Sequence, residues 1–198
     1  LFAWQMNGSA IASSDFVAGL GTDWKLAGTG DLDGDGKGDL LVQSSGGALF
    51  AWQMNGSAIA SSDYVASLGT DWELAGTGDL NGDGKTDFLV QNSGGALFAW
   101  QMNGNLITSS DFVAGLGTDW KLANTGDLDG DGKADLLVQN SGGALFAWLM
   151  NGSTIASSGY VAGLGTDWKV VDTGDSNGDG KSDLFVQSSG GALFQWQM

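Results

Sequence analysis

The chain has 198 residues, of which 23 are acidic and seven are basic, so its formal net charge is −16. Nucleic-acid phosphates and anionic membrane surfaces repel such a chain, and no apolar run approaches the roughly 18 residues of a membrane span. We therefore expect no nucleic-acid partner and no membrane insertion. Histidine and cysteine are absent, which removes the usual general base and the thiol nucleophile, so we expect no enzymatic activity.

The sequence repeats with a period of 48 residues. The motif LFAW begins at Leu1, Leu49, Leu97 and Leu145, and LFQW begins at Leu193. This divides one domain, residues 1–198, into repeats at 1–48, 49–96, 97–144 and 145–192, with a partial fifth repeat at 193–198. The nine tryptophans keep the same register in two columns. We expect most of them to pack between repeats.

One period contains four short strand signals, here taken from Trp72 onward. They are Trp72–Asp79, Phe88–Asn92, Ala96–Met102 and the more polar Leu106–Val113. Within the third, Phe98, Trp100 and Met102 alternate with Leu97, Ala99 and Gln101, which predicts a strand whose side chains point alternately to opposite faces. Asn103-Gly104 predicts a tight type I′ hairpin turn.

Four antiparallel strands in each 48-residue repeat predict an all-β fold, a β-propeller built from four-stranded blades. The small residues of Leu26–Gly30 suit the first strand to the crowded central axis, and the polar fourth strand suits the outer rim. Helices are disfavoured because glycine interrupts every apolar run. A closed ring, part of a larger ring and an open array all remain compatible with the sequence.

Each repeat carries an acidic loop between its first two strands, with the pattern Asp-x-Asp/Asn-x-Asp-Gly-Lys-x-Asp. Only oxygen donors occupy loop positions 1, 3, 5 and 9, while position 8 varies. The candidate metal ligands, with each lysine contributing its backbone carbonyl, are Asp31, Asp33, Asp35, Lys37 and Asp39; Asp79, Asn81, Asp83, Lys85 and Asp87; Asp127, Asp129, Asp131, Lys133 and Asp135; and Asp175, Asn177, Asp179, Lys181 and Asp183.

Calcium is the cation that this donor set favours. It takes six to eight oxygen ligands, whereas magnesium prefers to keep several waters. We expect Ca²⁺ at about one ion per repeat, four in total, with glycine at position 6 allowing a sharp turn. The loop is not a helix–loop–helix calcium hand, because position 12 is valine (Val42 in the first repeat). The alternative is an Asp/Gly-rich turn that needs no metal.

Blades with this loop between their first two strands resemble the FG-GAP/VCBS family of calcium-binding repeats, which includes integrin α-subunit propellers and propeller lectins. The resemblance covers all four repeats and is carried by GDLDGDGKGDLLV and by W-x-M-N-G. It implies a propeller fold, with the loop aspartates and asparagines as metal ligands. Because the chain has no proline, the Gly-Ala-Pro part of the family motif is absent, and integrin-like ligand binding gains no support.

Two functions follow as hypotheses. The first is a calcium-stabilised module, extracellular or at the cell surface, with a structural, adhesive or self-assembly role in which the partner is another copy of the chain. The alternative is a calcium-dependent propeller lectin that binds carbohydrate between blades through exposed tryptophans. A glycan-active enzyme would need a pair of acids outside the metal loops. The extracellular placement follows because weak calcium sites fill only where calcium is millimolar.

Overall fold

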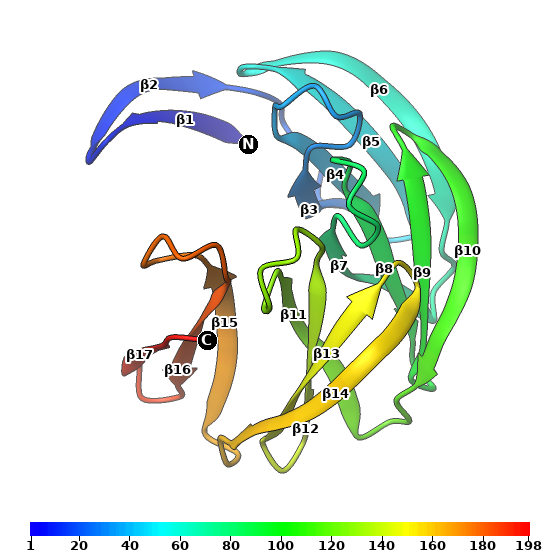
Figure 1. Ribbon diagram of the computed structural model, residues 1–198. Coiled ribbons are helices and arrows are strands. Elements are labelled where there is room, and N and C mark those ends of the chain that lie inside the picture. Colours follow the sequence, from blue (N-terminus) through cyan, green and yellow to red (C-terminus); the bar gives the residue numbers. More distant parts are fainter.

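The computed structural model describes all 198 residues, and its regular secondary structure consists only of β-strands (Figure 1). Three antiparallel sheets have four strands each, a fourth sheet has three strands, and the first two strands form a separate hairpin. The sheets are arranged as the blades of a β-propeller. The all-β propeller prediction is therefore confirmed.

The strands follow one another in chain order within each sheet. The hairpin consists of β1 (Phe2–Asn7) and β2 (Ala10–Phe16). Blade 1 consists of β3 (Trp24–Gly30), β4 (Asp39–Ser44), β5 (Ala48–Asn55) and β6 (Ala58–Ser67). Blade 2 consists of β7 (Trp72–Gly78), β8 (Asp87–Asn92), β9 (Ala96–Asn103) and β10 (Leu106–Gly115). Blade 3 consists of β11 (Trp120–Gly126), β12 (Asp135–Asn140), β13 (Ala144–Asn151) and β14 (Thr154–Gly163), and blade 4 of β15 (Trp168–Gly174), β16 (Asp183–Ser188) and β17 (Leu193–Trp196).

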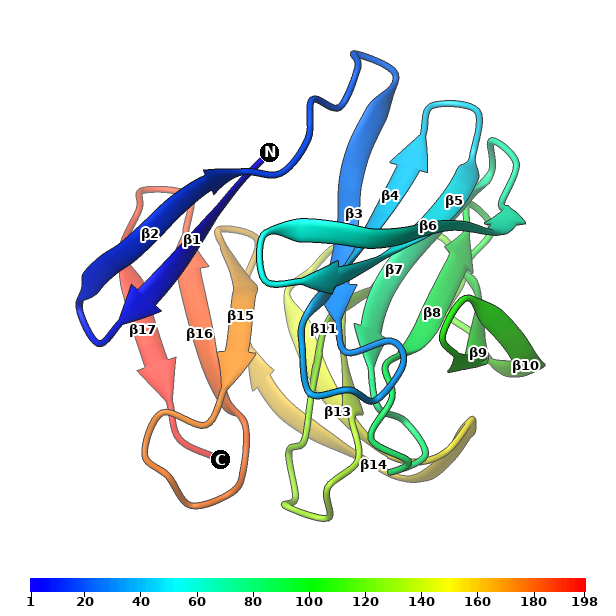
Figure 2. The ribbon, with the colours of Figure 1, turned by 90° about the horizontal axis from the view of Figure 1, so that it is seen from above.

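The first strand of each blade lies nearest the centre of the molecule, and β6, β10 and β14 lie at its periphery (Figure 1). The inner strands β3, β7, β11 and β15 contact one another in that order. Each sheet twists strongly, so that β6 crosses β3 at a large angle (Figure 2). The predicted order, with a small-residue inner strand and a polar outer strand, is thus confirmed.

Close approach between neighbouring inner strands explains why their residues are small. A Cβ atom added to Gly76 of β7 would lie 2.8 Å from the Cδ2 of Leu122 in β11. A threonine ladder runs through the same region: the Thr125 hydroxyl donates to the Thr77 carbonyl at 2.7 Å, and the Thr173 hydroxyl donates to the Thr125 carbonyl. Larger side chains here would force the blades apart.

The core lies between blades, and blades 2 and 3 bury both of their faces. Leu97 and Ala99 of β9 belong to a cluster shared with blade 3, whereas Met102 of the same strand packs with Leu32 and other residues of blade 1. This confirms the predicted alternation along β9. Most tryptophans pack between blades as expected, but they are half-buried, and Trp4 in the hairpin is 63% exposed.

The predicted type I′ turn is wrong. Asn103 pairs with Leu106, so the central turn residues are Gly104 and Asn105, and only Gly104 has a positive φ, of 64°. A positive φ at the first central residue alone is the pattern of a type II′ turn. The turn still joins the two strands tightly, as expected, because glycine adopts this conformation without strain.

The two ends of the series of blades differ from its middle. No hydrogen bond joins the hairpin β1–β2 to blade 4, so hydrogen bonds do not close the blades into a ring in this structure. The boundaries of the 48-residue repeats fall between the second and third strands of each blade. The hairpin β1–β2 therefore corresponds to the third and fourth strands of a blade. The structure contains no helix that is long and apolar enough to cross a membrane.

Candidate metal centre

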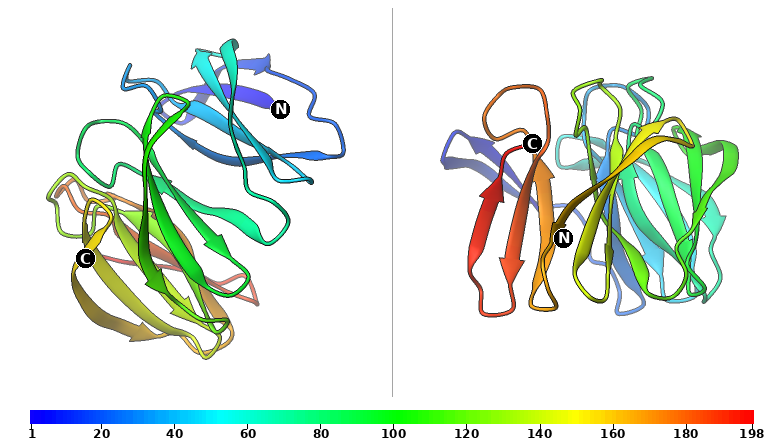
Figure 3. Two further views of the ribbon diagram at one scale, coloured as in Figure 1. Left: turned by 90° about the vertical axis from the view of Figure 1, so that its right-hand side faces the viewer. Right: turned by 60° about the horizontal axis from the view of Figure 1, so that its bottom comes forward.

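The four acidic loops join the first and second strands of blades 1 to 4. Because Gly30 pairs with Asp39 across the end of the sheet, residues 31–38 form the loop and position 9 is the first residue of β4. The same pairing recurs between Gly78 and Asp87 and in the later blades. The last of these loops, between β15 and β16, is the orange loop in the right panel of Figure 3.

The aspartate at position 1 organises the turn. In the first loop its carboxylate accepts the backbone N–H groups of Gly34 at 2.8 Å, Asp35 at 3.1 Å and Gly36 at 2.8 Å. Gly34 and Gly36 both have a φ of 82°, which confirms the predicted need for glycine at position 6 and adds the same need at position 4. The chain therefore winds tightly around the Asp31 carboxylate.

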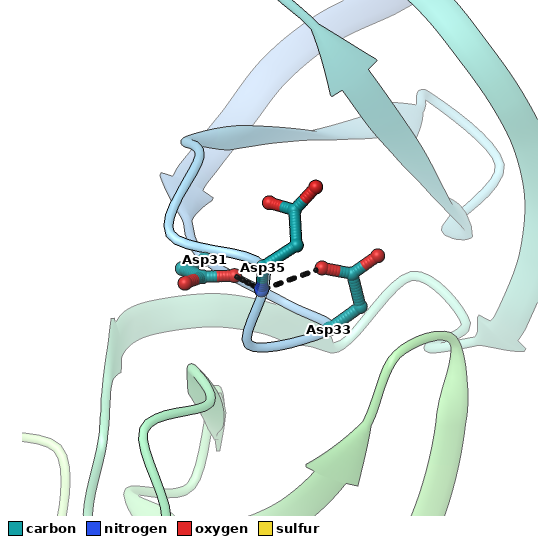
Figure 4. A group of neighbouring side chains, drawn as sticks. All are labelled: Asp31, Asp33 and Asp35. Carbon is teal, nitrogen blue, oxygen red and sulfur yellow. Dashed lines mark hydrogen bonds between the residues drawn. The ribbon is translucent and has the colours of Figure 1, made fainter.

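The winding brings the side chains at positions 1, 3 and 5 together. One carboxylate oxygen from each of Asp31, Asp33 and Asp35 lies within 4.8 Å of the others. Figure 4 shows the Asp35 N–H between the Asp31 and Asp33 carboxylates, to which it donates. A second such group of three joins Asp127 and Asp129 to Asp135 in the third loop.

Asparagine at position 3 holds the loop in the same way as aspartate. The Asn81 side-chain oxygen accepts the Asp83 N–H at 2.8 Å, and Asn177 accepts the Asp179 N–H at 2.9 Å. The Asp129 carboxylate makes the equivalent bond to Asp131 at 3.1 Å. Every loop therefore keeps an oxygen at position 3, although two loops carry one charge fewer.

The aspartate at position 9 is buried and ties the loop to the third strand. Asp87 accepts the N–H of Leu80, from the loop, at 3.1 Å and the N–H of Met102, from β9, at 2.9 Å. Burial raises the pKa of the Asp87 carboxyl to about 6 despite these two donors, and burial likewise raises the pKa values of Asp39 and Asp135. A nearby cation would favour the ionised form of each.

Lysine at position 7 has a side-chain role that sequence reasoning missed. The Lys133 amino group pairs with the position-5 carboxylate of Asp131 at 2.7 Å, and Lys37 pairs with Asp35 in the same way. These bonds lower the pKa values of both aspartates. Because both aspartates are exposed, the ion pairs contribute little to stability.

The donor set of each loop fits a hard divalent cation. Side chains at positions 1, 3, 5 and 9 supply oxygen alone, and carboxylate and amide oxygens are the donors that calcium takes. The side chains that would hold the ion in the first loop are Asp31, Asp33 and Asp35. Asp39 is held beside the loop, because its carboxylate accepts the N–H of Leu32.

The family model of the FG-GAP-like repeat matches residues 31–90, 79–138 and 127–186, which together span well over half of the chain. The chain belongs to the FG-GAP-like repeat family. Each match to the FG-GAP-like repeat begins at a position-1 aspartate and ends at a valine in the second strand of the next blade. Each match therefore covers two successive acidic loops and the strands between them.

Two kinds of solved structure resemble the FG-GAP-like chain at low identity. BBS1N in complex with ARL6DN, from a crystal soaked with mercury, aligns with a TM-score of 0.48 and 13% identity over 99% of this chain and 57% of that one. The C-terminal WD40 domain of Sif2 aligns with a TM-score of 0.40 and 12% identity, covering 93% and 61%. The chain spans less than two thirds of either. No match was found among curated proteins.

The opposite end of the blades carries a recurring polar pocket that sequence reasoning did not predict. Between blades 2 and 3 it has a volume of about 400 Å³ and is lined by residues that include Asp71, Trp72, Glu73, Asn92 and Trp120. Between blades 1 and 2 the equivalent pocket, of about 360 Å³, is lined by residues 48 positions earlier. The Gly-Thr-Asp segments predicted as interblade turns contribute to this lining.

Proposed function

We propose that this chain is a calcium-stabilised extracellular repeat module with a structural and adhesive role. The observation that carries the proposal is the convergence of the Asp31, Asp33 and Asp35 oxygens within 4.8 Å in a loop that recurs four times. Like charges at such separations repel one another, and a bound cation removes that repulsion. The extracellular placement follows from the modest affinity of most extracellular calcium modules, about 10⁻⁴–10⁻³ M.

The test is thermal unfolding with calcium and with chelator. At a tenfold excess over the dissociation constant each site adds about 1.4 kcal/mol, so four sites add about 6 kcal/mol, comparable to the whole stability of a typical domain. We expect a large fall in Tm with chelator. The triple variant Asp35→Asn, Asp83→Asn and Asp131→Asn should lose most of this difference. A variant with the same charge change outside the loops (Asp15→Asn, Asp63→Asn, Asp111→Asn) should keep it, and an unchanged wild-type Tm would refute structural calcium.

Self-association of the module is part of the proposal, and exposed apolar side chains support it. Phe2, Trp4 and Phe16 in the hairpin are 68%, 63% and 64% exposed, and Leu193 in β17 is 58% exposed, although its equivalents in the middle blades are fully buried. Exposed apolar surface of this kind favours contact with another copy of the chain. Sedimentation velocity over a range of concentrations tests this, and a monomer at every concentration would rule it out.

Carbohydrate binding is the second candidate function, and the recurring polar pocket favours it. The pocket places the half-buried rings of Trp72 and Trp120 beside carboxylate and amide groups such as Asp71 and Asn92. A flat ring edged by hydrogen-bonding groups suits a sugar, which has apolar faces and polar edges. Calcium at the far end of the blades would act here by holding neighbouring blades in place.

A glycan array of the calcium-loaded protein, repeated in chelator, tests this second function. Trp72 lines both described pockets, so Trp72→Phe should weaken any binding that uses them. Trp148→Phe is the matched control, because Trp148 lies between blades without lining either polar pocket. A blank array from a folded, calcium-loaded sample would exclude carbohydrate binding and leave the structural module as the one remaining candidate function.

A further inference from the structure

Backbone hydrogen bonds connect each acidic loop to the next one around the propeller. The N–H of loop position 8 donates to the carbonyl of the position-1 aspartate in the preceding loop. The three bonds run from Thr86 to Asp31 at 2.7 Å, from Ala134 to Asp79 at 2.6 Å and from Ser182 to Asp127 at 2.5 Å. Residue 8 lies between the predicted ligand positions 7 and 9. Each bond therefore joins the ligand set of one loop directly to that of its neighbour.

A second connection runs through the hairpin turn of the following blade. The N–H of Gly104 donates to the carbonyl of Leu32, loop position 2, at 2.9 Å, and Gly152 donates to Leu80 at the same distance. The turn at Gly104 follows Met102, whose N–H donates to the Asp87 carboxylate at position 9. Position 9 of one loop is thus linked to position 2 of the preceding loop.

The lysine stems add a packing contact between loops. A Cβ atom added to Gly34, loop position 4, would lie 3.4 Å from the Cγ of Lys85 in the next loop. Gly82 and Gly130 stand in the same relation to Lys133 and Lys181. Consecutive loops therefore touch through backbone bonds and through side chains, and a shift in one loop moves the other.

The four loops differ in how many of these connections they have. The first two loops accept both backbone bonds from the blade that follows, the third accepts only the bond from Ser182, and the fourth accepts neither. The second and fourth loops carry the same residue types at positions 1, 3, 5, 7 and 9, so they form a matched pair. They differ in the connections, at position 2, where Leu80 is replaced by Ser176, and at position 8, where Thr86 is replaced by Ser182.

We infer that the acidic loops bind divalent cations cooperatively from blade to blade, and that within residues 1–198 the fourth loop fills last. This inference rests on the proposed calcium function. A bound ion orders its loop, which fixes the position-1 carbonyl and with it residue 8 of the next loop. Part of the entropy cost of ordering the next ligand set is then already met, so the second ion binds more tightly. By linkage, the second ion strengthens the first by the same factor.

The test is a calcium titration of the whole chain followed by amide NMR. The position-6 glycines are suitable reporters, because the N–H groups of Gly36, Gly84, Gly132 and Gly180 each donate to the position-1 carboxylate of their own loop. We expect the second loop to fill at about fivefold lower calcium than the fourth, or lower still, as typical coupling free energies predict. Ser176→Leu controls for the difference at position 2 and should leave the order unchanged.

A loop knockout gives the independent measurement. Asp79→Asn with Asp83→Asn disables the second loop, and the first and third loops should then bind calcium about fivefold more weakly. The fourth loop, which does not touch the second, should change less. The variant is folded if the amide NMR signals of its strands match those of the wild type. If the first and third loops of this folded variant bind calcium with unaltered affinity, the inference is overturned. Equal filling of the second and fourth loops in the wild type would overturn it as well. If the four sites bind calcium independently, the proposed calcium function is kept and the inferred cooperativity is refuted. If no calcium binds at all, both are refuted.

Discussion

Gln195 donates a hydrogen bond to the hydroxyl of Ser176 in the last blade, at two positions where the other blades have alanine and a buried leucine. The Ser176 hydroxyl in turn donates to the Asp183 carboxylate. In blade 1 the equivalent Leu32 and Ala51 pack against the next blade. No further blade packs there in blade 4, so a polar pair is stable at this surface.

The first prediction concerns loop position 2, which is leucine in blade 1 and serine in blade 4. Leu32→Ser should lower the free energy of unfolding by roughly 2–5 kcal/mol, because it leaves a cavity and an unpartnered hydroxyl beneath the next blade. Ser176→Leu, the reverse change at the equivalent position, should cost less than about 1.5 kcal/mol, since the two hydrogen bonds that it removes belong to an exposed hydroxyl. Urea denaturation of both variants gives the comparison, and equal losses would show that position 2 is no more buried in blade 1 than in blade 4.

The second prediction concerns the titration of Asp87 in calcium-free protein. Its pKa is raised by burial to about 6, above the ordinary value of 3.8. The stabilisation that comes from protonating this carboxyl on folding is therefore complete below pH 3.8 and is lost as the pH rises through 6. We expect its side-chain carbon to titrate near pH 6 by NMR, and to titrate at lower pH once calcium binds.

Asp183 provides the contrast within the same experiment. The Ser176 hydroxyl bond lowers the pKa of this carboxyl, although it occupies the same loop position as Asp87. It should titrate below 3.8, and Ser176→Ala should move its titration upward. Identical titration curves for the two aspartates would contradict the role given to the serine.

The third prediction tests the close approach between the end of β7 and the acidic loop of the next blade. Gly78→Ala should destabilise the protein by roughly 1–3 kcal/mol, because the added methyl group would lie 2.6 Å from the Cβ of Ala134. Adding Ala134→Gly should restore much of this loss, since it removes the atom that clashes. A double-mutant cycle measured by thermal unfolding gives the coupling free energy, and additive effects would mean that Gly78 and Ala134 do not touch.

The fourth prediction concerns the threonine ladder. Thr125→Val should lower the free energy of unfolding by about 1 kcal/mol, because the hydroxyl bond to the Thr77 carbonyl is lost while the shape is kept. Thr29→Val is the matched control. Thr29 occupies the equivalent position in blade 1, and its carbonyl accepts a bond from Thr77 while its own hydroxyl donates none. The control should therefore change stability by a few tenths of a kcal/mol, and a similar loss in both variants would exclude the ladder as the cause.

Much of the fold could be predicted because the repeat pattern is local. The predicted strand from Phe88 to Asn92 begins one residue late, and the strand from Leu106 ends two residues early. The loop turn at Gly36 and the inner-strand glycines also follow from residues a few positions apart. The turn at Asn103-Gly104 was assigned the wrong type, because its class depends on how the flanking strands pair.

The sequence by itself determined the propeller blade, its strand order and the oxygen-rich pattern of each acidic loop. Periodicity and turn chemistry act over a few residues, and four copies repeat the same signal. Only the tertiary structure decided that position 9 is a buried strand residue, that Thr86 bonds to Asp31 in the preceding loop and that Trp72 and Trp120 share a pocket. The last two relationships join residues of different blades, about 48 or more positions apart, and such contacts exist only once the blades have packed together.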